Sequence, residues 1–353
     1  MLRPAPPYLG APVNTQTLRR IMSQVETQTS SMKRLLGNQQ LLLLAVWLLM
    51  VAVFTAFNSI FFSMAVFGNI LLDWAPVVLM AVGQTFVIIS GGIDLSVGST
   101  VGLSGVVAAF QMQKMMTNGD NQWTIIAVGT VFAAATGIVI GLINGFLITK
   151  AKMVPFIATL VTMGAAAGLA IVYSGGAPIA GGPDKAITLS VPWFGPFSTP
   201  GLIVVGIVII CGAFLHLSRF GRYTFAVGSN EFAARSAGIN VNRHYLKIYA
   251  LSGLLSGLAG MYFYCRLGSG APTSGYGGEL DAIAAVVIGG AALTGGVGRI
   301  TGTILGALIL TTTTSGLIII GVAPDWKQVV VAVLIAAAVL LQGFKSGTKG
   351  GGK

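Results

Sequence analysis

The chain has 353 residues, of which 54% are hydrophobic and only 8% are charged, and its mean hydropathy is +0.86. A soluble globular domain carries about 25% charged residues. This composition therefore excludes an ordinary soluble protein, and the recurring long apolar runs indicate an all-α, polytopic membrane protein. The net charge of +11 does not indicate nucleic-acid binding, because the basic residues are scattered through short segments between the apolar runs.

The chain divides into a polar N-terminal stretch, a long apolar region and a short C-terminal stretch. Residues 1–38 are polar and rich in proline at the start, which predicts a disordered cytoplasmic tail. Residues 39–343 form the predicted transmembrane domain, and residues 344–353 a second cytoplasmic tail. Cys211 and Cys265 fall in or beside predicted spans, so neither a disulfide nor a metal site is expected.

About ten membrane spans are predicted, because about 20 apolar residues cross a bilayer. In chain order they cover residues 41–60, 70–90, 95–113, 123–149, 153–173, 199–217, 246–266, 281–296, 300–321 and 327–343. With both termini in the cytoplasm, 16 of the 20 basic residues lie inside and four lie outside, namely Lys114, Lys185, Arg266 and Lys327. This bias follows the positive-inside rule.

Ten spans can be divided into two halves of five, and the second half then has the opposite orientation in the membrane. Faint sequence similarity supports such an inverted repeat. Residues 91–95, Gly-Gly-Ile-Asp-Leu, lie between spans two and three, and residues 277–281, Gly-Gly-Glu-Leu-Asp, lie between spans seven and eight. The paired glycines Gly137 and Gly141 have counterparts in Gly302 and Gly306, and glycines four residues apart favour close helix packing.

Asp94 is a carboxylate between glycines and an apolar run. At the start of span three it can cap the helix by accepting hydrogen bonds from the N–H groups of Ser96 and Val97, at a boundary predicted to be hydrated. It can also line the transport path or fix a moving hinge, because carboxylates within membrane proteins are candidates for function. Both interpretations stay open.

Other polar groups lie within the apolar runs and are candidates for the same path or hinge. A polar group in such a helix is buried against a partner or water, and each alone is more often an interhelical hydrogen bond than a substrate contact. An aromatic face can stack on a sugar. The candidates, with Asp94, are Ser96, Gln84, Asn144, Phe156 and Thr159, and the further polar positions are Thr162 and 311–315.

The longest internal loop, residues 218–245, lies on the cytoplasmic side of the predicted topology. Ser229 or Asn230 can cap a short helix within it, and Gly238 can end that helix. The pattern predicts a surface helix with small residues exposed to a partner. The alternative is a helix that only anchors the loop at the membrane interface.

Several motifs resemble the permease subunit of bacterial ABC importers for monosaccharides, the ribose/xylose/arabinose/galactose permease family. The resemblance covers residues 41–343 and is carried by residues 85–99, 141–145, 155–160, 219–222, 230–239 and 279–290. It implies a monosaccharide permease of the bacterial inner membrane. Its implied partners are a second permease copy or a paralogue, a periplasmic or lipid-tethered sugar-binding protein, and a cytoplasmic ATPase that holds the ATP and Mg²⁺.

ABC importers carry a cytoplasmic loop with the pattern Glu-Ala-Ala, three residues, Gly, which docks on the ATPase. Ala233, Ala234 and Gly238 match this spacing, whereas Phe232 displaces Glu231 by one position. The resemblance therefore assigns a coupling role to the loop as a whole. Its candidate residues are Arg219, Gly221, Asn230, Glu231, Ala233, Ala234, Arg235 and Gly238.

The sequence contains no G-x-x-x-x-G-K-[ST] nucleotide-binding loop, and no catalytic or metal-ligand arrangement is recognised in it. The chain is therefore not expected to be an enzyme or to bind a cofactor itself. Two other functions remain open from the residues alone: an ion-coupled secondary transporter, which an inverted repeat and Asp94 would suit, and a passive channel for small polar solutes.

Overall fold

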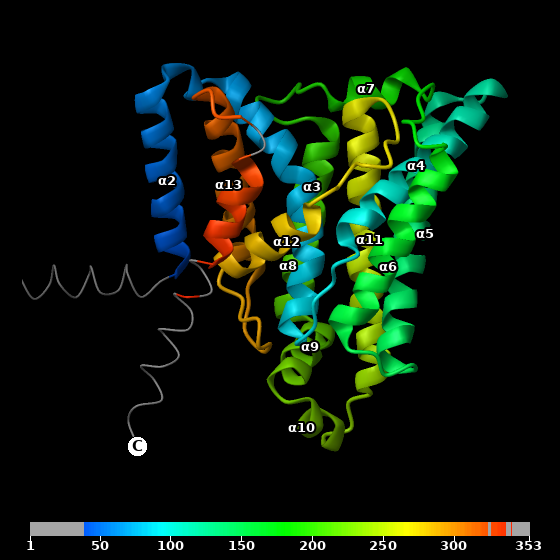
Figure 1. Cartoon of the computed structure of the whole chain (residues 1–353), viewed down its shortest axis with the longest axis vertical. Helices are drawn as coiled ribbons and strands as arrows, with labels where there is room; N and C mark the ends of the chain where they lie inside the picture. The colour runs from blue at the N-terminus through cyan, green and yellow to red at the C-terminus, as the bar shows by residue number, and fades with distance from the viewer. Residues whose placement is uncertain (1–38, 324–325, 337–339, 341–353) are drawn as a thin grey trace, which may run out of the picture.

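The computed structural model describes residues 39–323, 326–336 and 340. The tails predicted for residues 1–38 and 344–353 lie outside the described residues. Helices make up the described part, which contains no strand, and they pack side by side as a bundle (Figure 1). The all-α prediction is therefore confirmed for this part of the chain.

The described residues of the first half of the chain form five long helices and one short one. These are α2 (Gln39–Phe57), η1 (Ser59–Phe61), α3 (Met64–Ile89), α4 (Val97–Thr117), α5 (Gln122–Thr149) and α6 (Pro155–Ser174). Local sequence sets several of their ends. The Ser63 hydroxyl accepts a hydrogen bond from the N–H of Val66 at the start of α3, and Gly175 ends α6 in the left-handed conformation at φ 64°.

Within the described residues, the second half contains more short helices than the first. They are α7 (Asp184–Ser190), α8 (Thr199–Leu217), α9 (Arg219–Ser229), α10 (Glu231–Ser236), α11 (Val241–Leu267), α12 (Gly278–Ile288) and α13 (Ile300–Ile319). A further apolar helix covers Trp326–Ala336. In Figure 1, α9 and α10 project from one end of the bundle, and α7 lies at the opposite end.

Seven helices in the described ranges are long and apolar enough to cross a membrane: α2, α3, α5, α6, α8, α11 and α13. Three other predicted spans correspond to α4, which is long but less apolar, to α12 and to the helix Trp326–Ala336. The predicted eighth span, residues 281–296, is wrong in its extent. Its helix ends at Ile288, because Gly289 and Gly290 follow and Gly290 turns the chain with φ 92°.

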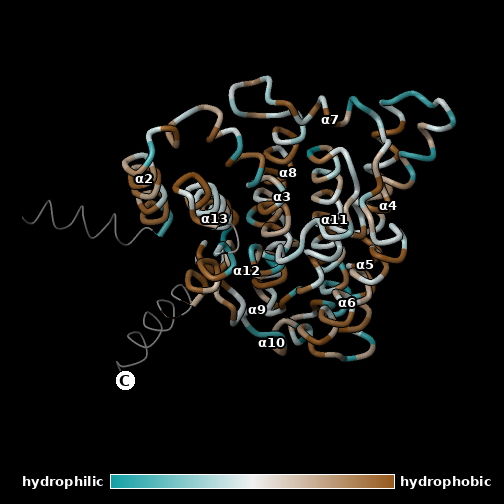
Figure 2. The backbone as a smooth tube through the Cα atoms, turned by 45° about the horizontal axis from the view of Figure 1, so that its top comes forward, coloured by the Kyte–Doolittle hydropathy of each residue, from teal (hydrophilic) through white to brown (hydrophobic). Residues whose placement is uncertain are grey.

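Helices α3 and α11 form the centre of the bundle. In their apolar windows 61% and 72% of the residues are buried, compared with 6% in α2. α11 packs against α3, α4 and α5, while α3 also packs against α12 and α13. Figure 2 shows hydrophobic stretches along the helices and hydrophilic residues gathered in the connecting loops, as expected of a membrane bundle.

The glycine pattern of α5 is a packing surface. A Cβ atom added to Gly137 would lie 2.0 Å from the carbonyl oxygen of Gly253, and one added to Gly141 would lie 2.1 Å from the carbonyl oxygen of Tyr249. Gly306 of α13 is as tightly placed, because a Cβ atom added to it would lie 2.0 Å from the carbonyl oxygen of Ala285 in α12. These backbones touch because no side chain intervenes, which confirms the packing interpretation of the repeated glycines.

Candidate functional site

The chain between α3 and α4 turns back into the bundle. Figure 1 shows this segment, residues 90–96, rising from the end of α3 to the start of α4 partway up the bundle. Gly91 takes φ 86°, which allows the reversal, and a Cβ atom at Gly92 would lie 2.4 Å from the hydroxyl oxygen of Tyr249. The glycines therefore let an irregular segment enter the protein interior.

Asp94 lies in this segment and is only 1% exposed. The predicted hydrated boundary is therefore wrong, because the segment folds back between helices rather than ending at a surface. The helix cap is also corrected: α4 begins at Val97 with Ser96 at the N-cap position, and no Ser96 side-chain cap bond forms. Asp94 still satisfies the Ser96 N–H, which donates to its Oδ1 over 2.9 Å.

The Asp94 carboxylate accepts three hydrogen bonds. Ser96 donates twice to Oδ1, from its N–H and from its hydroxyl at 2.6 Å, and the hydroxyl of Ser252 in α11 donates to Oδ2 at 2.9 Å. A buried carboxylate is costly unless it is fully hydrogen-bonded. This carboxylate thus ties the segment to α11.

Four of the other path or hinge candidates meet Asp94 in the same network. With its amide oriented to satisfy both bonds, Gln84 donates to the carbonyl oxygen of Asp94 and accepts from its N–H, both over 3.2 Å. The Asn144 amide donates to the Ser96 hydroxyl at 2.8 Å. The hydroxyl of Thr159 donates to the carbonyl of Ile93 at 3.3 Å.

The network therefore joins α3, α5, α6 and α11 to one irregular segment. Thr162 extends it by donating to the Asn144 amide oxygen. Phe156 does not join, because its side chain lies on the surface with 49% exposure. Ser252 was missed from the sequence, where it reads only as one of the small residues of a helix. A role of these residues in transport stays a prediction.

The predicted loop 218–245 is largely helical. Ser218 caps α9, because its hydroxyl accepts from the N–H of Gly221 at 3.1 Å, and Asn230 caps α10 by accepting from the N–H of Ala233 at 2.9 Å. Gly238 ends this turn at φ 83°, and the N–H of Ile239 then donates to the carbonyl of Ala234 at 3.1 Å. The predicted short helix between Asn230 and Gly238 is therefore confirmed.

Not every small residue of this segment faces outward. Ala234 is 4% exposed and packs against Val227 and Val241 within the segment itself, so its predicted exposure to a partner is wrong. Gly221 is also buried, where a Cβ atom would lie 1.7 Å from the carbonyl oxygen of Leu215. The exposed candidates are Arg219, Asn230, Glu231, Ala233, Arg235 and Gly238.

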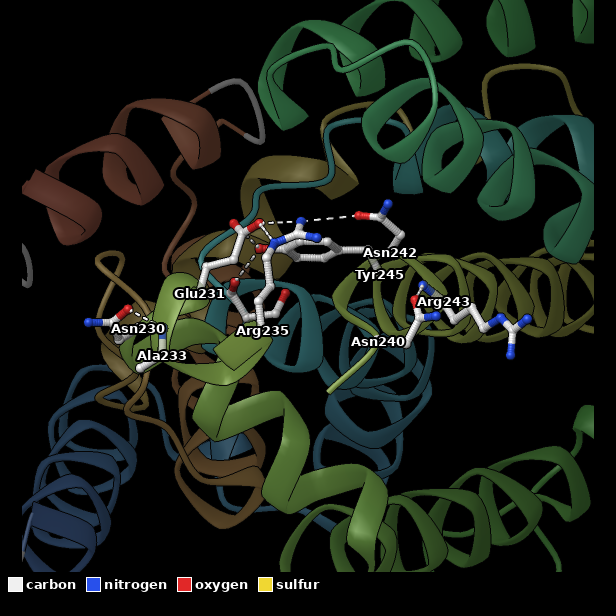
Figure 3. A network of polar contacts seen from close by, with 9 residues as sticks. Asn230, Glu231, Ala233, Arg235, Asn240, Asn242, Arg243 and Tyr245 are labelled. Carbon is white, nitrogen blue, oxygen red and sulfur yellow. Dashed lines mark hydrogen bonds and ion pairs between the residues drawn. The ribbon is translucent and has the colours of Figure 1, made fainter. Parts of the chain in front are cut away.

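A polar network connects α10 to the start of α11 and to the end of α3 (Figure 3). Arg235 forms an ion pair with Glu231 at 2.6 Å and donates to the Asn242 amide oxygen at 3.1 Å. The Tyr245 hydroxyl lies 3.4 Å from Glu231 Oε2 and 3.3 Å from the carbonyl oxygen of Ser90. Tyr245 was missed from the sequence, where it resembles any aromatic residue at a helix end.

Close backbone contacts join the end of α3 to α9 and to the connection between α12 and α13. Ile89 accepts a hydrogen bond from the N–H of Gly296 at 2.8 Å, and a Cβ atom at Gly228 of α9 would lie 1.7 Å from the Ile89 carbonyl oxygen. Beside α10, a cavity of about 480 Å³ separates Glu231 and Arg235 from the connection between α5 and α6. Helix α9 thus packs directly against the end of the central helix α3, and α10 is linked to it through α9 and Tyr245.

Together these features define a polytopic α-helical membrane protein with an exposed helical segment at one end. Residues 66–339 match the family described as the permease component of the branched-chain amino acid transport system. The chain belongs to this family of permease components.

Three relatives show how far the similarity extends. The ribose import permease protein RbsC of Escherichia coli K12 is 42% identical over 303 residues, 84% of this chain and 92% of that protein. RbsC of Bacillus subtilis is 44% identical over 280 residues, 79% of this chain and 84% of that protein. The galactose/methyl galactoside import permease protein MglC of E. coli K12 is 35% identical over 319 residues, 86% of this chain and 94% of that protein.

Proposed function

We propose that the chain is the membrane-spanning permease subunit of an ABC importer that carries a monosaccharide across the bacterial inner membrane. The observation that carries this proposal is the similarity to ribose and galactose import permease proteins over most of both chains. ATP and Mg²⁺ would be bound by a separate cytoplasmic ATPase, and a sugar-binding protein would deliver the substrate. A second permease copy or a paralogue would complete the pore.

We also propose ten spans with both termini in the cytoplasm, arranged as an inverted repeat of two halves. The packing of the described helices supports the repeat. In each half a central helix, α3 or α11, is followed by an irregular segment and another helix, α4 or α12. α4 packs against α11, and α12 packs against α3, so each half contributes the same pair of elements to the other.

The coupling role belongs to α9 and α10. Phe232, 81% exposed, and Ala233 give α10 an apolar outer surface next to the Glu231–Arg235 ion pair. A groove on an ATPase could accept such a helix through its apolar residues. Force applied to α10 would reach the end of α3 through Tyr245 and through the contact between Gly228 and Ile89.

The test is reconstitution in proteoliposomes with the cognate ATPase and binding protein. We expect uptake of radiolabelled D-ribose or D-galactose that requires ATP on the same side of the membrane as the ATPase. This uptake should stop when either the ATPase or the binding protein is left out. Uptake that persists without ATP would contradict the proposal. A permease that copurifies with no ATPase would contradict it as well.

A further inference from the structure

A cavity of about 630 Å³ lies in the half of the bundle away from α10, among α3, α13 and the connection between α11 and α12. Its volume is within the range of small-molecule sites, about 300–1,000 Å³. A second cavity, of about 300 Å³, shares Tyr276, Asp281 and Lys327 with it. In the proposed topology this half of the bundle faces the outside of the cell.

Two ion pairs line the larger cavity. Arg266, at the end of α11, pairs with Asp73 of α3, and Lys327 pairs with Asp281 of α12 at 2.7 Å. Charged side chains in membrane segments are costly, and they mark substrate pathways. The partial exposure of these four side chains, between 12% and 39%, leaves part of each group accessible.

The cavity wall also has neutral polar groups. Ser274 Oγ is buried without a hydrogen-bond partner among the described residues. The hydroxyls of Thr311 and Thr314 donate to carbonyls of their own helix, at 3.0 and 3.1 Å, so their oxygens keep free lone pairs. These groups add acceptors and a donor beside the two ion pairs.

The wall that carries Ser274 is held closely against α4. A Cβ atom at Gly98 would lie 2.5 Å from the carbonyl oxygen of Gly275, and one at Gly102 would lie 2.6 Å from that of Pro272. This contact with a glycine surface fixes the irregular connection between α11 and α12. The polar groups of the cavity are therefore preorganised, which lowers the entropic cost of binding a ligand.

We propose that this cavity is the site at which a monosaccharide, as a neutral polyol, first binds the permease after release from its binding protein. A carboxylate only accepts hydrogen bonds and a guanidinium or ammonium group only donates them, so each ion pair offers both functions side by side. Two neighbouring hydroxyls of a sugar, each both donor and acceptor, match that arrangement. The inference rests on the proposed function and adds a site to it.

The charge balance of the cavity favours a neutral ligand. Two basic groups face two acidic groups, and each basic group is already paired. An amino acid zwitterion would have to compete with both pairs for its two charges, whereas a sugar can bond to the outer lone pairs and N–H groups and leave the pairs intact. The Asp94 network is a different feature, because its groups bond to one another inside the bundle.

The first experiment neutralises one pair at a time in the proteoliposome assay, with Asp73→Asn/Arg266→Gln and Asp281→Asn/Lys327→Gln. We expect the uptake efficiency for D-ribose to fall about tenfold or more, as loss of charged hydrogen bonds predicts. Asp184→Asn and Lys185→Gln, in the first turn of α7 and outside the cavity, are the matched controls and should transport normally. Basal ATPase activity and copurification with the ATPase show whether each variant is assembled.

The second experiment leaves both pairs intact and measures occupancy directly. Thr314→Cys is made in a background of Cys211→Ala and Cys265→Ala and labelled with a membrane-impermeant methanethiosulfonate. We expect D-ribose to slow the labelling and L-leucine to have no effect. Asn118→Cys, exposed at the end of α4 and outside the cavity, should label at the same rate with or without sugar.

The outcomes separate the site from the function. In one outcome the wild type imports D-ribose, both double variants transport normally, and D-ribose does not change the labelling rate of Thr314→Cys. The cavity is then not the sugar site, but the proposed importer function is retained. If D-ribose protects Thr314→Cys from labelling but no ATP-driven uptake is found, the sugar site is supported and the importer function is contradicted. Protection by L-leucine alone would overturn the assignment to sugars.

Discussion

At the scale of single residues, Asp94 is a buried carboxylate that links the segment before α4 to α11. Its carboxylate is removed from water, and three donors, two on Ser96 just before α4 and one on Ser252 of α11, replace the solvent. A group that is buried and fully bonded resists substitution, because each donor left without an acceptor costs about 1–3 kcal/mol. The residue therefore stabilises the turn between α3 and α4, whatever further role it has in transport.

Asp94→Ala should lower the stability of the detergent-solubilised protein by about 2–5 kcal/mol, because two Ser96 donors and the Ser252 hydroxyl lose their acceptor. Asp120→Ala, in the exposed turn after α4, is the control and should have little effect. Thermal unfolding of the two variants measures the difference. Equal stability would show that this network contributes nothing to the fold.

Ala233 and Ala234 are neighbours with different surroundings, so they should respond differently to the same change. Ala234→Glu places a charge among Val227 and Val241, and it should unfold the segment itself. Ala233 is exposed, so Ala233→Glu should leave the permease as stable as the wild type. The same change should block copurification of the ATPase. Limited proteolysis of residues 218–245 distinguishes the two, and normal copurification with Ala233→Glu would exclude this surface from docking.

At the scale of elements, the glycine contacts hold the helices closer than side chains would allow. Gly141→Ala should destabilise the bundle by about 1–3 kcal/mol, because the new methyl group meets the Tyr249 carbonyl in α11. Gly164→Ala in α6 is the matched control, since nothing lies within 4 Å of its added Cβ atom. Thermal stability in detergent should fall only for the first, and equal effects would contradict the close packing.

The elements also show what the sequence could and could not predict. The long apolar helices, the cap at Asn230 and the stop at Gly238 follow from local patterns, and the structure has them. The return of residues 90–96 into the bundle does not follow, because glycines beside an aspartate also suit a surface turn. The burial of Ala234 depends on Val227 and Val241, which come together only once α9 and α11 are folded.

The cavity between α3 and α13 was beyond prediction for the same reason. Asp73 and Arg266 are 193 positions apart, and Asp281 and Lys327 are 46 positions apart. No periodicity within one helix pairs such residues. Ser252 and Tyr245, which complete the two described networks, likewise acquire their roles from contacts between distant segments.

At the scale of the whole molecule, the described contacts form a route from the exposed helix α10 to the centre of the bundle. Tyr245→Phe removes the hydroxyl that lies near both Glu231 and the Ser90 carbonyl. We expect normal assembly with the ATPase, because α10 keeps its surface, but weaker stimulation of ATP hydrolysis by the sugar-loaded binding protein. Stimulated ATPase activity equal to wild type would show that Tyr245 carries no coupling.

The paired charges of the outer cavity have an electrical consequence. Moving one elementary charge across a membrane potential involves about 2.3 kcal/mol per 100 mV. Two positive and two negative groups around an uncharged sugar sum to zero, so opening this cavity to either side of the bilayer does no net work against the field. The rate of import should therefore stay the same when a potassium diffusion potential is imposed on the proteoliposomes, and the energy of each cycle would come from ATP alone.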